Sequence, residues 1–196
     1  MKALDKDGVR QWLSTRSLPY DTYTRGVRPK WGSTAGVDIE IAVNTAVPEI
    51  RGLLWLFHVM PHEDASDWQA ESLVIFQDCF LNEDPLYDRM VFLLRGGTTA
   101  ETPTLSAAYA QCFREEERLE RASFFMIGLL ADWDTYFIPG HGVFFLFAHD
   151  RELHIVCESE ETVAPQLECL RSEGARVRTS KAGRPFLLDR YWRVPP

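Results

Sequence analysis

The chain has 196 residues, a net charge of −8, and 45% hydrophobic and 12% aromatic residues. This length suits one domain, which can bury roughly 70% of the surface of the unfolded chain, so we predict a single folded domain over residues 1–196. The charged start (MKALDKD) is unlike a secretory signal, and no apolar run reaches the roughly 20 residues of a membrane helix. We therefore expect a cytoplasmic protein with no membrane partner.

Charge is distributed unevenly along the chain. Residues 1–36 contain seven basic and three acidic side chains, and residues 171–196 contain seven and two. Residues 37–170 contain seven basic and 24 acidic side chains, a net charge of −17. Nucleic-acid binding depends on clustered Lys and Arg, so the acidic middle argues against a nucleic-acid partner. It favours a basic protein partner, which such a field attracts.

Four patterns stand out in the first half of the chain. Apolar residues at helical spacing predict a short helix over residues 5–16. Its inward side chains would be Val9, Trp12 and Leu13. Turn-forming residues predict a long irregular connection over 17–36. Strict alternation predicts a half-buried strand over 37–43, with Asp38 and Glu40 on its polar side. The apolar stretch 50–60 fits either a helix or a strand.

The middle of the chain contains two apolar segments that read as helices and two that read as strands. Ser66 and Gln69 fit a capping box, which predicts a helix over 67–81. A second helix is predicted from Thr102-Pro103 through Phe113 into the acidic residues 115–117, since proline is tolerated in a first turn. The predicted buried strands cover residues 90–94 and 124–127.

The last third of the chain predicts a hairpin followed by a helix. Residues 135–138 form a short extended segment, and strands over 143–147 and 153–157 flank a turn. A helix is predicted over 162–173, with closing strands at Val177 and 186–191. Helices interspersed with antiparallel strands indicate the α+β class, with a single mainly antiparallel sheet and helices packed on one face.

The residues that could ligate a metal or act as a nucleophile form no recognised motif. The four cysteines are far apart, so we predict reduced, buried thiols, although Cys79 or Cys112 could in principle pair with a histidine. His58 and His62 have i, i+4 spacing, but Pro61 lies between them. Phosphate-binding loops and the Gly-x-Ser-x-Gly elbow are absent. We therefore predict no cofactor and no metal, and we favour a protein without catalytic activity.

The segment 132–142 (DWDTYFIPGHG) is the most unusual in the chain. Two aspartates bracket a tryptophan, and an acidic turn follows at residues 149–152. An aromatic and acidic ledge of this kind is suited to gripping a partner. The alternative is that Trp133 and Tyr136 pack in the core while the aspartates face water. The predicted partner-binding residues are Asp132, Trp133, Asp134, Tyr136, His149, Asp150, Glu152 and Glu158.

The order of these features resembles that of small uncharacterised bacterial α+β proteins. The resemblance rests on the alternating strand with Asp38 and Glu40, the segment IFQDCF at 75–80, the strand near residues 91–94 and the turn HDRE at 149–152. Some such proteins resemble immunity proteins of polymorphic toxin systems. The resemblance implies an intracellular protein that neutralises a partner and has no catalytic residues.

Three hypotheses follow from the sequence. The first is a non-catalytic, immunity-type binding protein with an acidic and aromatic surface for a basic partner. The second is an enzyme, with or without a metal in its chemistry, whose site lies near Asp132, Asp134, His141 and His149. The third is a scaffold subunit that forms homodimers through its aromatic surface.

Overall fold

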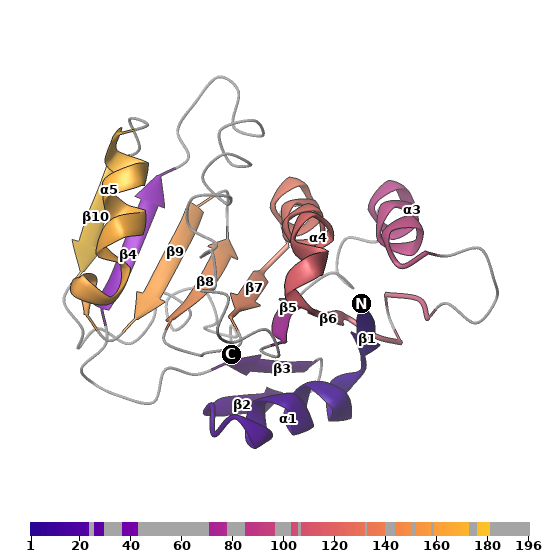
Figure 1. Cartoon of the computed structure of the whole chain (residues 1–196). Coiled ribbons are helices and arrows are strands. Elements are labelled where there is room, and N and C mark those ends of the chain that lie inside the picture. Colours follow the sequence, from indigo (N-terminus) through magenta and orange to yellow (C-terminus); the bar gives the residue numbers. More distant parts are fainter. Residues whose placement is uncertain are drawn as a thin grey trace, which may run out of the picture.

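The computed structural model describes residues 1–23, 26–29, 37–42, 71–77, 85–96, 103–105, 107–131, 133–139, 144–149, 152–157, 159–172 and 176–180. These residues form one large and one small sheet with helices packed against them (Figure 1). The strands are β1 (Lys2–Leu4), β2 (Tyr20–Tyr23), β3 (Gly26–Pro29), β4 (Val37–Ala42), β5 (Ser72–Phe76), β6 (Ala110–Phe113), β7 (Thr135–Ile138), β8 (Phe144–His149), β9 (Glu152–Cys157) and β10 (Arg176–Ser180). The helices are α1 (Lys6–Thr15), α3 (Pro85–Leu94), α4 (Arg118–Leu130) and α5 (Ala164–Ser172), with short 3-10 turns η1 (Glu115–Glu117) and η2 (Glu160–Val163).

The large sheet has eight strands in the order β1-β6-β5-β7-β8-β9-β4-β10, and β2 pairs with β3 in the small one. Every neighbouring pair of described strands is antiparallel. The predicted α+β class, with a mainly antiparallel sheet and helices packed on it, is confirmed.

Helix α4 covers one face of the large sheet, which we call the α4 face. A Cβ at Gly128 of α4 would lie 3.0 Å from Phe76 and 2.9 Å from Thr135 Cβ, so this helix approaches β5 and β7 closely. Arg121 is buried on the same side and donates to Ser72 Oγ at 3.0 Å. Helix α4 connects β6 to β7, and α5 connects β9 to β10. The two strands of each connection are parallel, with one antiparallel strand between them: β5 in the first case and β4 in the second. Because such crossovers are right-handed, both helices lie on the α4 face.

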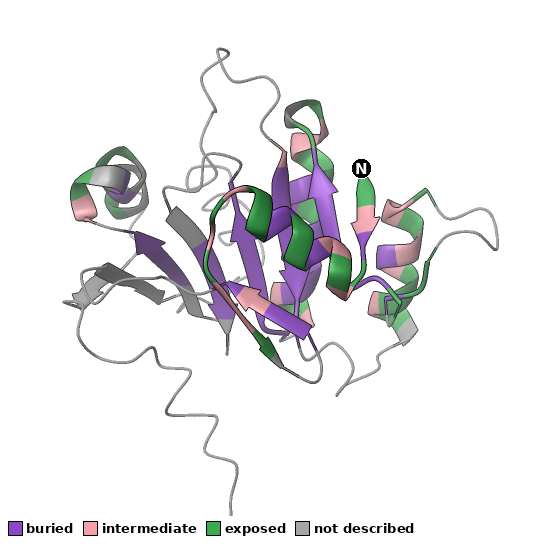
Figure 2. Cartoon of the chain, turned by 90° about the horizontal axis from the view of Figure 1, so that it is seen from below, coloured by how far each residue is buried: buried purple, intermediate pink, exposed green. Residues whose placement is uncertain are grey.

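Helix α1 and the β2–β3 pair cover the opposite face near β6 and β5, and we call this the α1 face (Figure 1). Asp5 caps α1 by accepting a hydrogen bond from Gly8 N at 2.8 Å, and a Cβ at Gly8 would lie 3.2 Å from Leu4. Leu4 pairs with Ala110 of β6, which places α1 against that side. The β1–β7 part of the sheet is therefore covered on both faces rather than on one, and burial runs through its central strands (Figure 2).

The predicted helix over 5–16 is confirmed, with its three inward side chains buried. The predicted irregular connection over 17–36 is wrong in part, because β2 and β3 lie within it. Gln77 Nε2 donates to Val27 O at 3.0 Å and ties this hairpin to the end of β5. A short strand pair packed against a sheet needs little periodicity of its own, which is why turn residues concealed it.

Four predicted elements in the middle of the chain are wrong. Strand β5 lies within the segment predicted as a helix over 67–81, and β6 lies within the predicted helix that ends at Phe113. Conversely, α3 contains the predicted strand 90–94, and α4 contains the predicted strand 124–127. All the residues of β5 and β6 are buried. A strand buried on both faces loses its period of two, so its apolar run does not distinguish it from a buried helix.

The remaining predicted elements that fall on described residues are confirmed within a few residues. Strands β4, β7 and β10 and helix α5 lie within the segments that the sequence predicted for them. The predicted hairpin is β8–β9, whose register runs from Phe144 opposite Cys157 to His149 opposite Glu152. The stretches 50–60 and 186–191 lie outside the described residues.

Candidate functional site

Three of the predicted site residues occupy one row across neighbouring strands. Gln77 N donates to Asp134 O at 2.6 Å, directly beyond the pairing of Phe76 with Thr135. Thr135 pairs with Ala148, so the next position along β8, His149, lies beside Asp134 in the register. His149 in turn pairs with Glu152 of β9. The sheet thus brings an aspartate, a histidine and a glutamate together at one end of β7, β8 and β9.

A second row lies two residues further along the same strands. Tyr136 pairs with Phe147, and Phe147 pairs with His154. The Tyr136 and Phe147 rings stack at 4.6 Å between centroids, and the His154 ring lies 5.9 Å from Phe147. The row continues through Glu40 of β4 to Arg178 of β10. Because residues two apart point to the same side, both rows belong to the α1 face.

The described polar side chains of these rows are buried. Asp134 is 3% exposed, His154 3% and Tyr136 0%. A buried carboxylate and a buried imidazole lose hydration, and they are retained in a core only with polar partners. His154, Glu40 and Arg178 are not among the site residues predicted from the sequence, where Glu40 was placed only on the polar side of a strand. The signal that could have found them is the alternation in β4 and β9, where polar residues recur at every second position.

The predicted aromatic ledge is wrong as a surface feature. Trp133 is 2% exposed and lies on the α4 face, with its ring 5.3 Å from Phe76 and 5.9 Å from Tyr87. Tyr136 is fully buried on the α1 face. The alternative, in which both aromatics pack in the core, is the arrangement found. Asp134 is buried too, which differs from the expectation that the aspartates face water. Asp132 lies outside the described residues.

Among the acidic residues of the hairpin region, Glu152 does not adjoin Glu160 and Glu161. Strand β9 is extended from Glu152 to Cys157, and Glu160 and Glu161 follow its far end. Six residues of strand span about 20 Å, so these acids lie at opposite ends of β9. Asp150, Glu158 and His141 lie outside the described residues.

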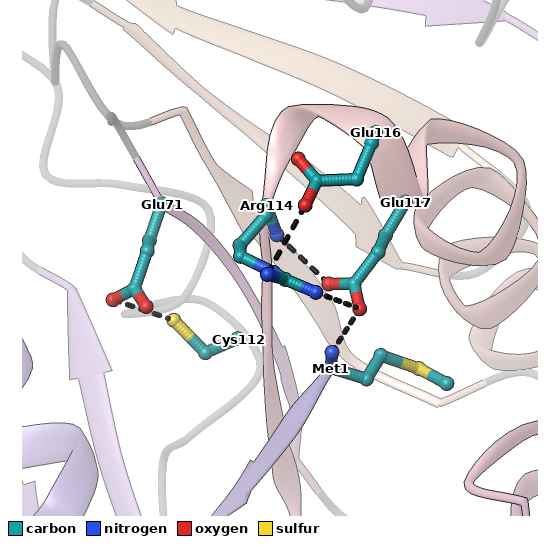
Figure 3. A network of polar contacts seen from close by, with 6 residues as sticks. All are labelled: Met1, Glu71, Cys112, Arg114, Glu116 and Glu117. Atoms are coloured by element: carbon teal, nitrogen blue, oxygen red, sulfur yellow. Dashed lines mark hydrogen bonds and ion pairs between the residues drawn. The ribbon is translucent and has the colours of Figure 1, made fainter. Parts of the chain in front are cut away.

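Cys112 is not an activated nucleophile. Its thiol donates to Glu71 Oε2 at 3.4 Å, and no histidine contact accompanies it among the described residues (Figure 3). Burial, and then the charge of Glu71, raises the pKa of Cys112 to about 12. The thiol is therefore protonated at neutral pH, whereas nucleophilic cysteines need a lowered pKa. Cys112 and Cys157 are both free and buried, as predicted.

Some acidic side chains at the start of α4 are already neutralised within the chain. Glu117 pairs with the amino group of Met1 and with Arg114, whose backbone N donates to Glu117 Oε2 at 2.9 Å (Figure 3). Partial burial by itself raises the pKa of Glu117. The amino group of Met1 and Arg114 outweigh this effect and lower the pKa below its usual value. Glu116 pairs with Arg114 at 3.2 Å.

Other acids on the same side are exposed and have no ion-pair partner within the described chain. These are Glu120 of α4, Glu161 of η2 and Glu168 of α5. Glu120 lies on α4, which packs on β5, β7 and β8, whereas Glu161 and Glu168 lie on η2 and α5 toward the β9–β10 end of the sheet. All three are separate from the buried rows on the α1 face. We call Glu120, Glu161 and Glu168 the helical acidic surface.

These features define an α+β protein with two rows of sheet residues on one face and three exposed carboxylates on the helical elements of the other. No family model, curated protein or solved structure matches this chain. Within the side chains that the structure describes, no group of three or more His, Cys, Asp or Glu could hold a metal ion. No helix in the described ranges is long and apolar enough to cross a membrane.

Proposed function

We propose that this protein is a non-catalytic, immunity-type binding protein that engages a basic protein partner. The observation that carries the proposal is the helical acidic surface, where Glu120, Glu161 and Glu168 are exposed. Residues 37–170 carry a net charge of −17, and exposed carboxylates in such a segment create a negative field around the protein. Such a field accelerates association with a basic partner and makes it sensitive to salt. Trp133 and Tyr136 take no part in this surface.

The test is a titration of the purified protein against basic proteins encoded beside its gene, followed by kinetics at low and physiological salt. Charge reversal at Glu120, Glu161 and Glu168 should lower the association rate at low salt at least about tenfold. The matched pair is Glu161→Lys and Asp7→Lys, because each adds two charges and Asp7 lies on exposed α1, with its side chain 87% exposed. If no basic candidate binds at low salt, the function is wrong. If both single variants slow association equally, the acidic surface is not the docking site.

A second candidate function, an enzyme with acid–base or metal-assisted chemistry, is supported by the row of Asp134, His149 and Glu152. Two carboxylates and an imidazole are a donor set that divalent transition metals accept, and they also serve as general acids and bases. The strand register places the backbones of these three residues side by side. Their spacing in the sequence is not that of a known catalytic or metal-binding motif.

Elemental analysis of the purified protein, with thermal unfolding in added Zn²⁺ or Mn²⁺, separates this candidate from the first. A stoichiometric metal that is lost in His149→Ala, and kept in the control Glu120→Gln, would favour the enzyme. A metal-free protein whose unfolding temperature does not respond to either ion would remove the metal-dependent form of this candidate.

A further inference from the structure

The β8–β9 hairpin contains three residues of the types that bind metal ions. His149 is the last residue of β8, Glu152 is the first residue of β9, and His154 follows two positions later. Imidazole nitrogens and carboxylate oxygens are ligands that Zn²⁺ and other divalent transition metals accept. Because all three residues lie within six positions of the sequence, the pairing of two adjacent strands is enough to bring them together.

Strands β8 and β9 lie side by side in the large sheet (Figure 1), and their register places the three residues at adjoining positions. His149 pairs with Glu152. Phe147, two residues before His149, pairs with His154, so the two histidines are diagonal neighbours on the α1 face. Diagonal positions are about 7–8 Å apart, a distance that two imidazoles can span to reach one metal ion at about 2.0–2.1 Å from each nitrogen.

His154 is enclosed in the sheet face rather than turned toward solvent. Its side chain is 3% exposed, and its ring lies 5.9 Å from that of Phe147. On the other side, the register pairs His154 with Glu40 of β4. A histidine that binds a metal commonly donates its second ring N–H to a carboxylate, which fixes the orientation of the ring. Glu40 occupies the position from which a carboxylate can serve His154 in this way.

The spacing of the strands favours His154 over Asp134 as the third ligand. Asp134 lies beside His149 on the side away from Glu152, so β8 separates the two acidic residues. Two strand spacings amount to about 10 Å, which an aspartate and a glutamate bridge poorly at metal–oxygen distances of about 2.0–2.2 Å. The set of His149, Glu152 and His154 occupies two neighbouring strands and needs no such reach.

We propose that His149, Glu152 and His154 bind one divalent transition metal, with Glu40 as a positioning residue for His154. Two histidines and one carboxylate are the protein ligands of catalytic Zn²⁺ and Fe²⁺ sites, because they leave coordination positions open for water or substrate. The proposal rests on the metal-dependent form of the second candidate function and replaces Asp134 by His154 among its ligands. It is independent of partner binding at the helical acidic surface.

Zn²⁺ binding to the purified full chain, without an affinity tag, tests the ligand set. Calorimetric titration should give one Zn²⁺ per chain, with a dissociation constant that rises at least about 100-fold in His154→Gln and about tenfold in Glu40→Gln. His62→Ala is the matched control, because it removes a histidine from outside the hairpin, and it should leave the affinity unchanged. Asp134→Asn should have a much smaller effect than His154→Gln. Far-UV circular dichroism verifies that each variant is folded.

X-ray absorption at the zinc edge of the loaded wild type gives a second measurement that needs no variant. The proposed set predicts two imidazole ligands, whereas the row of Asp134, His149 and Glu152 predicts one. A single imidazole, or a greater loss of affinity in Asp134→Asn than in His154→Gln, overturns the proposal and leaves the second candidate function standing. Equal losses in His154→Gln and His62→Ala also overturn it. A chain that binds no stoichiometric Zn²⁺ overturns both the proposal and the metal-dependent form of the second candidate.

Discussion

The closest approach between a helix and the sheet is at Gly128, and replacing it with alanine tests the packing of α4. A Cβ at this position would overlap Thr135 Oγ1 and lie 2.9 Å from Thr135 Cβ and 3.0 Å from Phe76 Cε1. Thr135 is fully buried, and its hydroxyl donates to Trp133 O at 2.9 Å. The alanine methyl therefore has to displace a hydroxyl that is already engaged.

Two opposing effects set the sign of the Gly128→Ala change in unfolding free energy. Alanine is favoured over glycine inside a helix by about 1 kcal/mol. Overpacking costs about 1–3 kcal/mol, and a buried hydroxyl that loses its partner costs about 1–3 kcal/mol. The variant should be about 2–3 kcal/mol less stable than the wild type. For a chain of this length that corresponds to a fall of roughly 5–10 °C in the unfolding temperature.

Urea unfolding followed by circular dichroism measures the difference, and Gly8→Ala is the control. A Cβ at Gly8 would meet only side-chain atoms, the nearest at 3.2 Å, so helix propensity should leave that variant as stable as the wild type or about 1 kcal/mol more stable. In a Thr135→Ala background the overlap with the hydroxyl is gone, and Gly128→Ala should cost about 1–2 kcal/mol less. Equal costs in both backgrounds, or a stable Gly128→Ala variant, would refute the proposed contact.

Three further predictions concern buried or paired groups. The pKa of Cys112 is raised by burial and by Glu71 from 9.0 to about 12, so the protonated thiol stabilises the fold below pH 9 and this contribution is lost as pH rises toward 12. Cys112→Ala should therefore flatten the alkaline fall in unfolding free energy measured in urea. Burial opposes the lowered pKa of Glu117, but its cationic partners prevail, so its stabilisation is present above its usual pKa of 4.5 and is lost as pH falls. Glu117→Gln should cost about 1 kcal/mol at neutral pH and weaken the acid dependence of stability in the same assay. Trp133→Ala should cost about 3–5 kcal/mol in urea, and a loss below about 1 kcal/mol would contradict its core position.

The sequence predicted most accurately the elements whose apolar and polar residues recur with a clear period. Helix α1 has such a period of 3.6 and strand β4 a period of 2, and both were placed within one or two residues. Helix α5 and the β8–β9 hairpin were located instead from apolar segments bounded by turn residues. A period of 3.6 or 2 is visible in the sequence only where the two sides of an element differ in polarity.

The two strands that were predicted as helices, β5 and β6, are buried on both sides. Strand β5 lies between α4 and the α1 face, and its five residues SLVIF are all buried. Helix α4 buries seven of its residues, including four consecutive large apolar ones, and such a run resembles a buried strand in the sequence. In both cases the local sequence fits a helix and a strand equally well. Contacts with residues far away in the sequence determine which of the two forms.

The candidate site shows the same limit in another form. The alternation of polar residues in β4 and β9 was visible, but the pairing of Glu40 with His154 joins segments more than 100 residues apart, and no local pattern specifies it. The ledge at Trp133 failed for a related reason, because aromatic residues beside aspartates occur in cores as well as at interfaces.

The two proposed functions lie on opposite faces of one sheet, and this separates their tests. Reversing the charge of Glu161 changes the outer side of the α4 face and leaves the row of Asp134, His149 and Glu152 untouched. Replacing His149 changes the α1 face and leaves the helical acidic surface intact. The buried carboxylate of Asp134 lowers the stability of the sheet core. Residues that lower stability in this way are concentrated at functional sites. If a partner binds the wild type and His149→Ala equally, the row of Asp134, His149 and Glu152 has no part in partner binding.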